Sequence, residues 1–256
     1  MLKELTLPVV ITTVVIIVLI LIYIYLPKYL ITSKNKYTVL MAGQSVTDQW
    51  FRNRELPDVL NNLGMWRNWH IPYDQHMKDD VYYKKLRIPS PRENKKHPNY
   101  KFGENTLKTI TKSLDEKHYD ALMFKYCFVD YGDSSINTLE KLEQRFNELT
   151  KLVEEVHKTA SERDTKLILG NAMPSFESSE YSQELRFKFN KWVDDYVKEN
   201  EDIAKIELFD NLAGENGNLR IEYSLDPSDH ESHLNKKAYL ILEEELSSAL
   251  EKLRNK

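Results

Sequence analysis

Short apolar segments alternate with longer amphipathic segments along most of this chain. The segments that we expect to form buried strands are 37–41, 121–128, 166–169 and 204–209. The segments with helical spacing of their apolar residues are 48–63, 105–114, 138–160, 182–200 and 235–253. Strands that alternate with helices form a parallel sheet covered by helices on both faces. The sequence therefore predicts an α/β domain with this architecture, which we place at residues 37–256.

One segment interrupts this alternation. Residues 64–100 contain four prolines, several basic residues and the aromatic residues Trp66, Trp69, Tyr73, Tyr82 and Tyr83. A loop of this length is unusual in a compact domain and often has a function. We interpret residues 64–100 as an insertion or loop region, which either walls a substrate cleft or packs as an excursion on the surface.

The first 30 residues differ from the rest of the chain. Twenty consecutive positions, Leu7–Leu26, carry no charge, and a helix of that length spans about 30 Å, the thickness of a bilayer's hydrocarbon core. A cleavable signal peptide has a shorter apolar core and a small-x-small cleavage site, whereas this run ends in tyrosines, Pro27 and Lys28. The sequence predicts a single transmembrane anchor at residues 1–30 and a tether at 31–36.

The membrane side of the domain is a separate question. Lys28, Lys34 and Lys36 follow the apolar run, and the positive-inside rule taken literally would keep the domain in the cytoplasm. Short N-terminal tails followed by a domain are nevertheless often translocated. We expect a single-pass membrane protein with an extracytoplasmic domain.

Composition excludes several classes of function. The chain has 30% charged residues and a net charge of -4, with Lys and Glu interleaved, so it lacks the basic patch of a nucleic-acid-binding protein. The seven glycines form no phosphate-binding pattern, and His70, Asp74 and His76 fit no standard zinc signature. We expect no cofactor and no metal. The single Cys127 rules out an internal disulfide and reads as a buried thiol.

Polar residues follow the predicted strands. Sites in parallel α/β sheets form at the carboxyl ends of the strands, where Ser45, Asp130, Asn171 and Asp210 are expected. A serine hydroxyl becomes a nucleophile when a base, usually histidine, takes its proton. His233 lies just before the last predicted helix and is a candidate base. Alternatively, Ser45 simply caps a helix and His233 is an ordinary surface histidine.

Two strings carry a resemblance to a known family. Gly43-Gln44-Ser45 follows the first strand and His233-Leu234-Asn235 precedes the last helix, and in these features the chain resembles the SGNH (GDSL-like) hydrolases. The strings 43–46 and 124–130 are similar to those of one subgroup. The resemblance implies a flavodoxin-like three-layer α/β/α fold, Ser45 as the nucleophile and His233 as the base.

The chain departs from the family pattern at two positions. The family has an Asp three residues before the catalytic His, but this chain has His230 there and Asp229 one residue earlier. The resemblance implies that Asp229 orients His233, with Asp226 as the alternative. The family's oxyanion-binding Asn is replaced by Val129.

Other residues must then bind the oxyanion or the substrate. The order of the motifs places the family's second motif at Gly103, with Asn105 as a side-chain donor. The remaining candidates are Lys125, Asp130 and Asn171.

These residues predict a membrane-anchored serine esterase. It would hydrolyse or transfer a short acyl ester on a carbohydrate or lipid-associated substrate. Two alternatives remain: a catalytically inactive binding domain of the same fold, and an acyltransferase that acts with a membrane partner. The sequence gives no oligomeric state.

Overall fold

The computed structural model describes residues 37–53, 75–78, 81–89, 101–132, 136–230 and 232–255. The predicted anchor at 1–30, the tether at 31–36 and much of the 64–100 segment lie outside the described residues. Within the described ranges, no helix is both long enough and apolar enough to cross a membrane.

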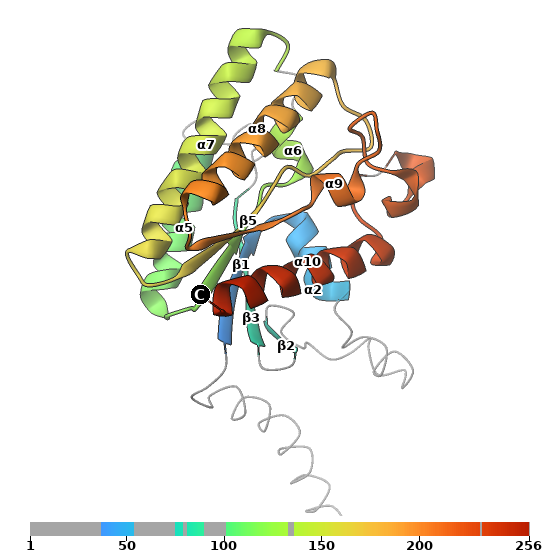
Figure 1. The fold of residues 1–256 in the computed structure, drawn as a ribbon. Helices are drawn as coiled ribbons and strands as arrows, with labels where there is room; N and C mark the ends of the chain where they lie inside the picture. Colours follow the sequence, from blue (N-terminus) through green and yellow to red (C-terminus); the bar gives the residue numbers. More distant parts are fainter. Residues whose placement is uncertain are drawn as a thin grey trace, which may run out of the picture.

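The centre of the molecule is a six-stranded sheet with the order β2-β3-β1-β4-β5-β6 (Figure 1). Its strands are β1 (Tyr37–Gly43), β2 (Gln75–Lys78), β3 (Val81–Arg87), β4 (Ala121–Phe124), β5 (Lys166–Gly170) and β6 (Ile203–Ile206). Five of them run parallel, and β2 pairs antiparallel with β3 at the edge. The predicted parallel α/β sheet is confirmed.

Strand β3 corrects the interpretation of residues 64–100. It pairs with β1 over the full length of both strands, from Tyr37↔Val81 to Gly43↔Arg87, so this part of the segment belongs to the sheet and is not an insertion. Its second half contains two consecutive lysines, which hide the apolar pattern of a strand. Lys85 is accommodated because its ammonium lies 2.8 Å from the carboxylate of Asp48, which lies on α2 (Ser45–Asn53).

Within the described ranges, five long helices cover the sheet. They are α2 (Ser45–Asn53), α5 (Phe102–Glu116), α7 (Leu139–Ser161), α8 (Glu180–Glu199) and α10 (Lys236–Arg254). Shorter turns are α6 (Phe128–Tyr131), α9 (Phe209–Leu212), η1 (Ile221–Tyr223) and η2 (Pro227–Asp229). The helices at α5, α7, α8 and α10 agree with the predictions to within a few residues. Helix α2 begins three residues earlier than predicted, and residues 54–63 lie outside the described part.

Two predicted strands end earlier than expected. Strand β4 stops at Phe124 because the chain turns into α6, and β6 stops at Ile206 ahead of α9. Both predicted extensions contain apolar residues, Cys127 and Phe128 in one case and Leu208 and Phe209 in the other. A short apolar run has the same composition in a strand and in a buried turn, so composition alone does not separate them.

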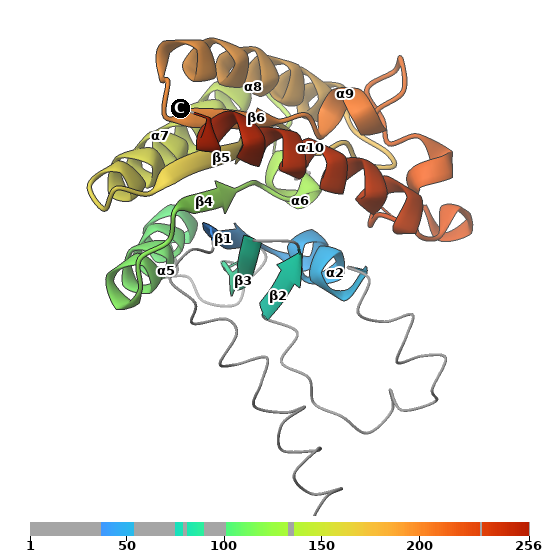
Figure 2. The same ribbon diagram turned by 60° about the horizontal axis from the view of Figure 1, so that its bottom comes forward.

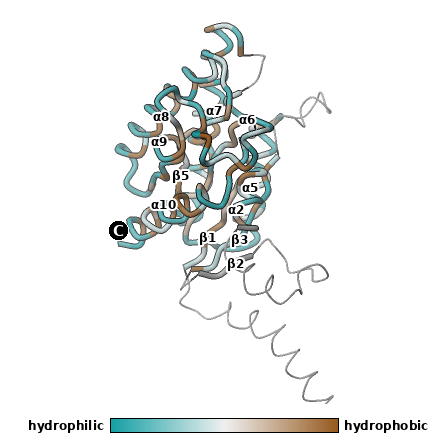
Figure 3. The backbone as a smooth tube through the Cα atoms, turned by 90° about the vertical axis from the view of Figure 1, so that its right-hand side faces the viewer, coloured by the Kyte–Doolittle hydropathy of each residue, from teal (hydrophilic) through white to brown (hydrophobic). Residues whose placement is uncertain are grey.

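Successive residues of the strands face two separate cores. Val39 and Met41 lie in the core formed with α2 and α10, whereas Leu40 and Ala42 lie in the core formed with α5, α7 and α8. This alternation places one helical layer on each face of the sheet. The helices also carry apolar and polar residues in turn: in Figure 3, hydrophilic and hydrophobic stretches alternate along them.

Candidate active site

Ser45 lies where β1 turns into α2, at the carboxyl edge of the sheet. The turn requires glycine at position 43, because a Cβ there would lie 1.9 Å from Oγ1 of Thr47. The carbonyl of Gln44 accepts the first helical hydrogen bond, from the amide of Asp48 at 3.0 Å. Gln44 and Val46 are buried, while Ser45 between them is exposed. The tight turn therefore presents the serine hydroxyl at the surface.

His233 is held by the two residues that follow it. Leu234 is buried in the core beside α10, and Asn235 caps that helix by accepting a hydrogen bond from the amide of Ala238 at 3.2 Å. The Asn235 amide also donates to the carbonyls of Glu222 and Ser224, at 2.9 and 3.1 Å. The His-Leu-Asn string thus fastens the end of the loop to the start of the helix, with His233 half-buried at its edge.

The structure brings these two residues together. Nε2 of His233 lies 3.0 Å from Oγ of Ser45, although 188 positions separate them in the sequence. This distance lies within the range needed for proton transfer between a nucleophile and its general base. The Phe128 ring on α6 packs edge-on against the imidazole, with 5.3 Å between ring centroids. In Figure 2, α2, α6 and the beginning of α10 gather at this end of the sheet.

Helix α10 also fixes the position of the serine turn. The hydroxyl of Tyr239 donates to the carbonyl of Val46 and contacts Oε1 of Gln49, both at 3.1 Å. Nε1 of Trp50, which is fully buried, donates to Glu243 at 2.5 Å. Since α10 begins three residues after His233, the same helix positions both members of the pair.

Asp130 connects the serine turn to α6. Its carboxylate accepts hydrogen bonds from the amide of Cys127 at 2.6 Å and from Nε2 of Gln44 at 3.3 Å. Burial of the carboxyl group raises the pKa of Asp130 to about 6, against the lowering effect of these two hydrogen bonds. Asp130 was predicted to bind the oxyanion or substrate; the structure shows it as an acceptor beneath the turn.

Cys127 lies under Ser45, with 3.9 Å between Sγ and Oγ. The thiol is buried as predicted. Burial raises the pKa of Cys127 above its ordinary value, which keeps the sulfur protonated and poorly nucleophilic near neutral pH. Ser45 is therefore the better candidate nucleophile of the two.

Two of the predicted oxyanion donors have other partners. Oδ1 of Asn171 accepts from the amides of Leu208 and Phe209, at 2.6 and 3.0 Å, and its Nδ2 donates to Glu207 at 2.6 Å. Asn171 follows β5, two strands away from β1, and fastens the turn after β6. Lys125 is fully buried and its Nζ lies 3.7 Å from Sδ of Met173; burial lowers the pKa of this amine. Neither side chain is directed at Ser45 by the contacts it makes.

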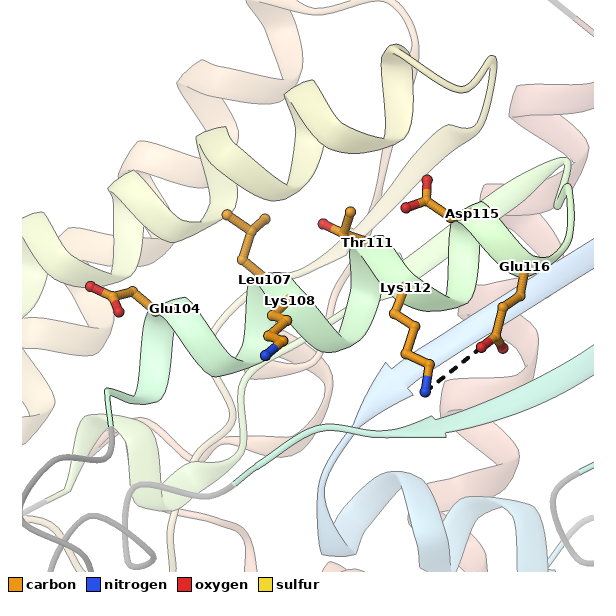
Figure 4. A pocket seen from close by; sticks show the side chains of 7 residues that line it. All are labelled: Glu104, Leu107, Lys108, Thr111, Lys112, Asp115 and Glu116. Atoms are coloured by element: carbon orange, nitrogen blue, oxygen red, sulfur yellow. Dashed lines mark ion pairs between the residues drawn. The ribbon is translucent and has the colours of Figure 1, made fainter.

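The predicted donors on α5 are also engaged or distant. Nδ2 of Asn105 donates to the carbonyl of Lys101 at 3.0 Å within the first turn of that helix, and Gly103 lies in the same turn. No contact among the described residues links either one to Ser45 or His233. An open hollow runs along α5, and the described residues that line it all belong to this helix (Figure 4). It is separate from the Ser45–His233 pair.

The predicted triad acid shows no contact with the histidine. Asp226 accepts hydrogen bonds from the amide and hydroxyl of Ser228, at 3.0 and 2.6 Å, and so caps η2. Asp229 is exposed, and within the described part of the chain neither carboxylate is hydrogen-bonded to His233. The family spacing places the acid three residues before the histidine, whereas Asp229 stands four residues before His233. The orienting role of Asp229 stays a prediction.

Sequence reasoning gave no role to Gln44, Phe128 or Tyr239. Gln44 and Phe128 lie in strings that the sequence singles out and Tyr239 lies in the last predicted helix, but each contacts a residue far away in the chain. No periodic pattern indicates such contacts. Among the described residues, no cluster of three or more His, Cys, Asp or Glu side chains could hold a metal ion.

Comparison with solved structures identifies the fold. A GDSL-like lipase from Bacteroides thetaiotaomicron is 18% identical, with a TM-score of 0.56 over 89% of this chain and 96% of that one. A lipase/acylhydrolase from Enterococcus faecalis is 13% identical, with a TM-score of 0.50 over 86% and 96%. No family model matches this chain, and no curated protein matches its sequence. The chain has the SGNH (GDSL-like) hydrolase fold.

Proposed function

We propose that this protein is a serine esterase or acylhydrolase whose nucleophile is Ser45 and whose general base is His233. The observation that carries the proposal is the 3.0 Å contact between Oγ of Ser45 and Nε2 of His233. It occurs at the carboxyl edge of a parallel sheet, where such folds place their sites. The similarity to GDSL-like lipases and acylhydrolases supports the same class of reaction.

The reaction would proceed through an acyl-enzyme. His233 takes the proton of Ser45 as Oγ attacks the ester carbonyl carbon, and the carbonyl oxygen becomes an oxyanion. The histidine then gives this proton to the departing alcohol, which leaves the acyl group on Ser45. A water molecule, deprotonated by His233, attacks the acyl-enzyme and releases the carboxylic acid, and the proton returns to Oγ.

The first turn of α2 would supply hydrogen bonds to the oxyanion. The first amides of a helix have no partner within the helix, and the positive end of the helix dipole favours negative charge there. Ser45 is the first residue of α2, so its own N–H is the natural donor. We propose this backbone group in place of the missing family Asn, because Asn171 and Lys125 are engaged elsewhere.

The proposed substrate is a short acyl ester on a carbohydrate or lipid-associated molecule. The protein would be tethered by residues 1–30, with the domain outside the cytoplasm. The apolar run Leu7–Leu26 supports the anchor. The exposed Ser45 supports a substrate that approaches from the surface, because its carbonyl need not enter a closed cavity.

The test is hydrolysis of p-nitrophenyl acetate and butyrate by the full chain, purified in detergent. Ser45→Ala should abolish turnover, and His233→Gln should lower it by about 100-fold or more. Ser247→Ala is the matched control, because this exposed serine bonds only to a carbonyl within α10. Its turnover should equal that of the wild type. Turnover retained by a folded Ser45→Ala variant would exclude the mechanism.

A binding domain without catalysis is the second candidate. Val129 at the position of the family's oxyanion-binding Asn favours it. Variants Asp229→Asn and Asp226→Asn examine the two candidate triad acids directly. If the wild type hydrolyses neither ester and transfers no acyl group from a donor in the presence of membranes, the binding-domain reading replaces the esterase.

A further inference from the structure

Arg186 is a charged side chain in the interior of the molecule. It lies on α8 and has no exposed surface. Burying a guanidinium without a carboxylate partner is costly unless its donors are satisfied. Burial lowers the pKa of Arg186 to about 10, which still leaves it charged at neutral pH. A buried charge of this kind needs a structural or functional reason.

All the hydrogen bonds described for Arg186 go to neutral oxygens. Its acceptors are the carbonyl of Met173 at 2.9 Å, Oγ of Ser178 at 2.7 Å, the carbonyl of Ser182 at 3.2 Å, the carbonyl of Phe128 at 3.3 Å and Oγ of Ser175 at 3.0 Å. Five contacts match the five N–H donors of a guanidinium. The side chain also lies over the ring of Tyr131, 5.7 Å from its centroid.

Four of these five acceptors belong to two segments beside His233, and the fifth, the carbonyl of Ser182, lies on α8 itself. The first is α6, which carries Phe128; its carbonyl accepts from Arg186 and its ring packs against the imidazole of His233 at 5.3 Å. The second is the loop 173–178 between β5 and α8. Lysine could not span both, because a single ammonium lacks the planar fork of arginine.

The loop 173–178 in turn contacts the residues next to His233. The amide of Phe176 donates to Oγ of Ser232 at 2.9 Å, and Ser232 immediately precedes His233. The Phe176 ring stacks on His230 with 4.9 Å between centroids, and Oε1 of Glu177 lies 2.7 Å from Nδ1 of His230. The loop that carries His233 therefore rests on a segment that Arg186 holds.

We infer that Arg186 is a positioning residue, which keeps His233 within hydrogen-bonding distance of Ser45 by fastening α6 and the loop 173–178 to α8. It touches neither reacting atom. Its two lines of contact, through the ring of Phe128 and through Ser232, approach His233 from different elements. This inference rests on the proposed function only in so far as catalysis reports the position of the histidine.

The test compares Arg186→Lys with the wild type in the full chain. Lysine keeps the charge but cannot reach both segments, so kcat/KM for p-nitrophenyl acetate should fall about 10- to 100-fold, mainly through kcat. If Arg186 instead acted on substrate binding, the substitution would change KM. His157→Phe serves as a control for general destabilisation, because His157 bonds to Tyr196 and Asp202 away from the loops that carry Ser45 and His233. Measured at one temperature at which both proteins are folded, it should retain wild-type kcat.

A neighbouring pair of serines gives a milder version of the experiment. Ser178→Ala removes one acceptor of Arg186, whereas Ser179→Ala removes the cap of α8, which accepts from Ser182 and has no bond to Arg186. Ser178→Ala should lower kcat severalfold, and Ser179→Ala should lower stability and leave kcat unchanged. This pair decides the question if Arg186→Lys does not fold.

A readout besides catalysis separates this inference from the proposed function. The ring nitrogens of His233 can be followed by NMR, with their signals assigned by comparison with His233→Gln. When Ser45→Ala is made in the otherwise wild-type chain, the chemical shift of Nε2 should change. In Ser178→Ala or Arg186→Lys that response should weaken. An unchanged response together with unchanged kcat would overturn the inference. Failure of the wild type to hydrolyse esters would overturn the proposed function alone, because the NMR comparison still stands.

Discussion

Replacing Asp130 by Asn should change the pH dependence of stability in a defined direction. The Asp130 carboxyl is buried beneath the serine turn and its pKa rises from 3.8 to about 6. The folded protein therefore binds this proton more tightly than the unfolded chain does. Ionising the buried group destabilises the fold, so the wild type loses stability as the pH rises from about 3 to about 7, by about 3 kcal/mol at this site. Above that range the penalty is constant.

Asparagine cannot ionise and should escape this penalty. Its Oδ1 can still accept from the Cys127 amide, and a rotated Gln44 amide can accept from its Nδ2. The difference in the free energy of unfolding, variant minus wild type, should therefore rise by about 3 kcal/mol between pH 3 and pH 7. Urea unfolding of both proteins at five pH values measures it, and the other titrating groups cancel in the difference. A difference that stays flat with pH would refute the reasoning.

Three further substitutions test the surroundings of the site. Gly43→Ala should displace Thr47 and the start of α2, so esterase kcat should fall far more than the melting temperature; equal kcat would show that the turn tolerates a side chain. Asn171→Ala should cost about 2–4 kcal/mol in urea unfolding because two buried amides lose their acceptor, while kcat of the folded variant stays unchanged. Lys125→Met should raise stability at neutral pH, since it removes a buried amine whose pKa burial lowers. That gain should shrink as the pH rises and the wild-type amine loses its proton, and a constant or negative effect in the same titration would contradict it.

The order of strands and helices could be predicted because each element carries its own periodicity. The four predicted strands and the long helices α5, α7, α8 and α10 follow from local patterns of apolar residues. Strand β3 could not be predicted, because its buried half, Val81–Tyr83, is too short to show alternation and is followed by Lys84 and Lys85. Lys85 becomes acceptable only in the fold, where Asp48 pairs with it.

In the candidate site, too, some residues could be predicted from local sequence and others could not. Ser45 and His233 could be found because short strings at the ends of predicted elements mark them, and the structure places their side chains in contact. The oxyanion donors could not be found in this way, because a residue acts as a donor only if its N–H points at the oxyanion. Asn171 and Asn105 have suitable side chains, yet both bond to neighbouring backbone or side-chain atoms. The role of Arg186 could not be predicted from the sequence for the same reason, since its partners come from α6, α8 and the loop between β5 and α8.

The most direct test of the central claim is labelling of the full chain with a fluorophosphonate, followed by peptide mapping. The account predicts one adduct, on the peptide that contains Ser45, which is lost in Ser45→Ala and forms at least about 100-fold more slowly in His233→Gln. It also predicts that Cys127→Ala labels normally, because the buried thiol takes no part in the attack. No adduct on folded wild-type protein, or labelling at Ser45 that is indifferent to His233, would contradict the assignment of this pair as nucleophile and base.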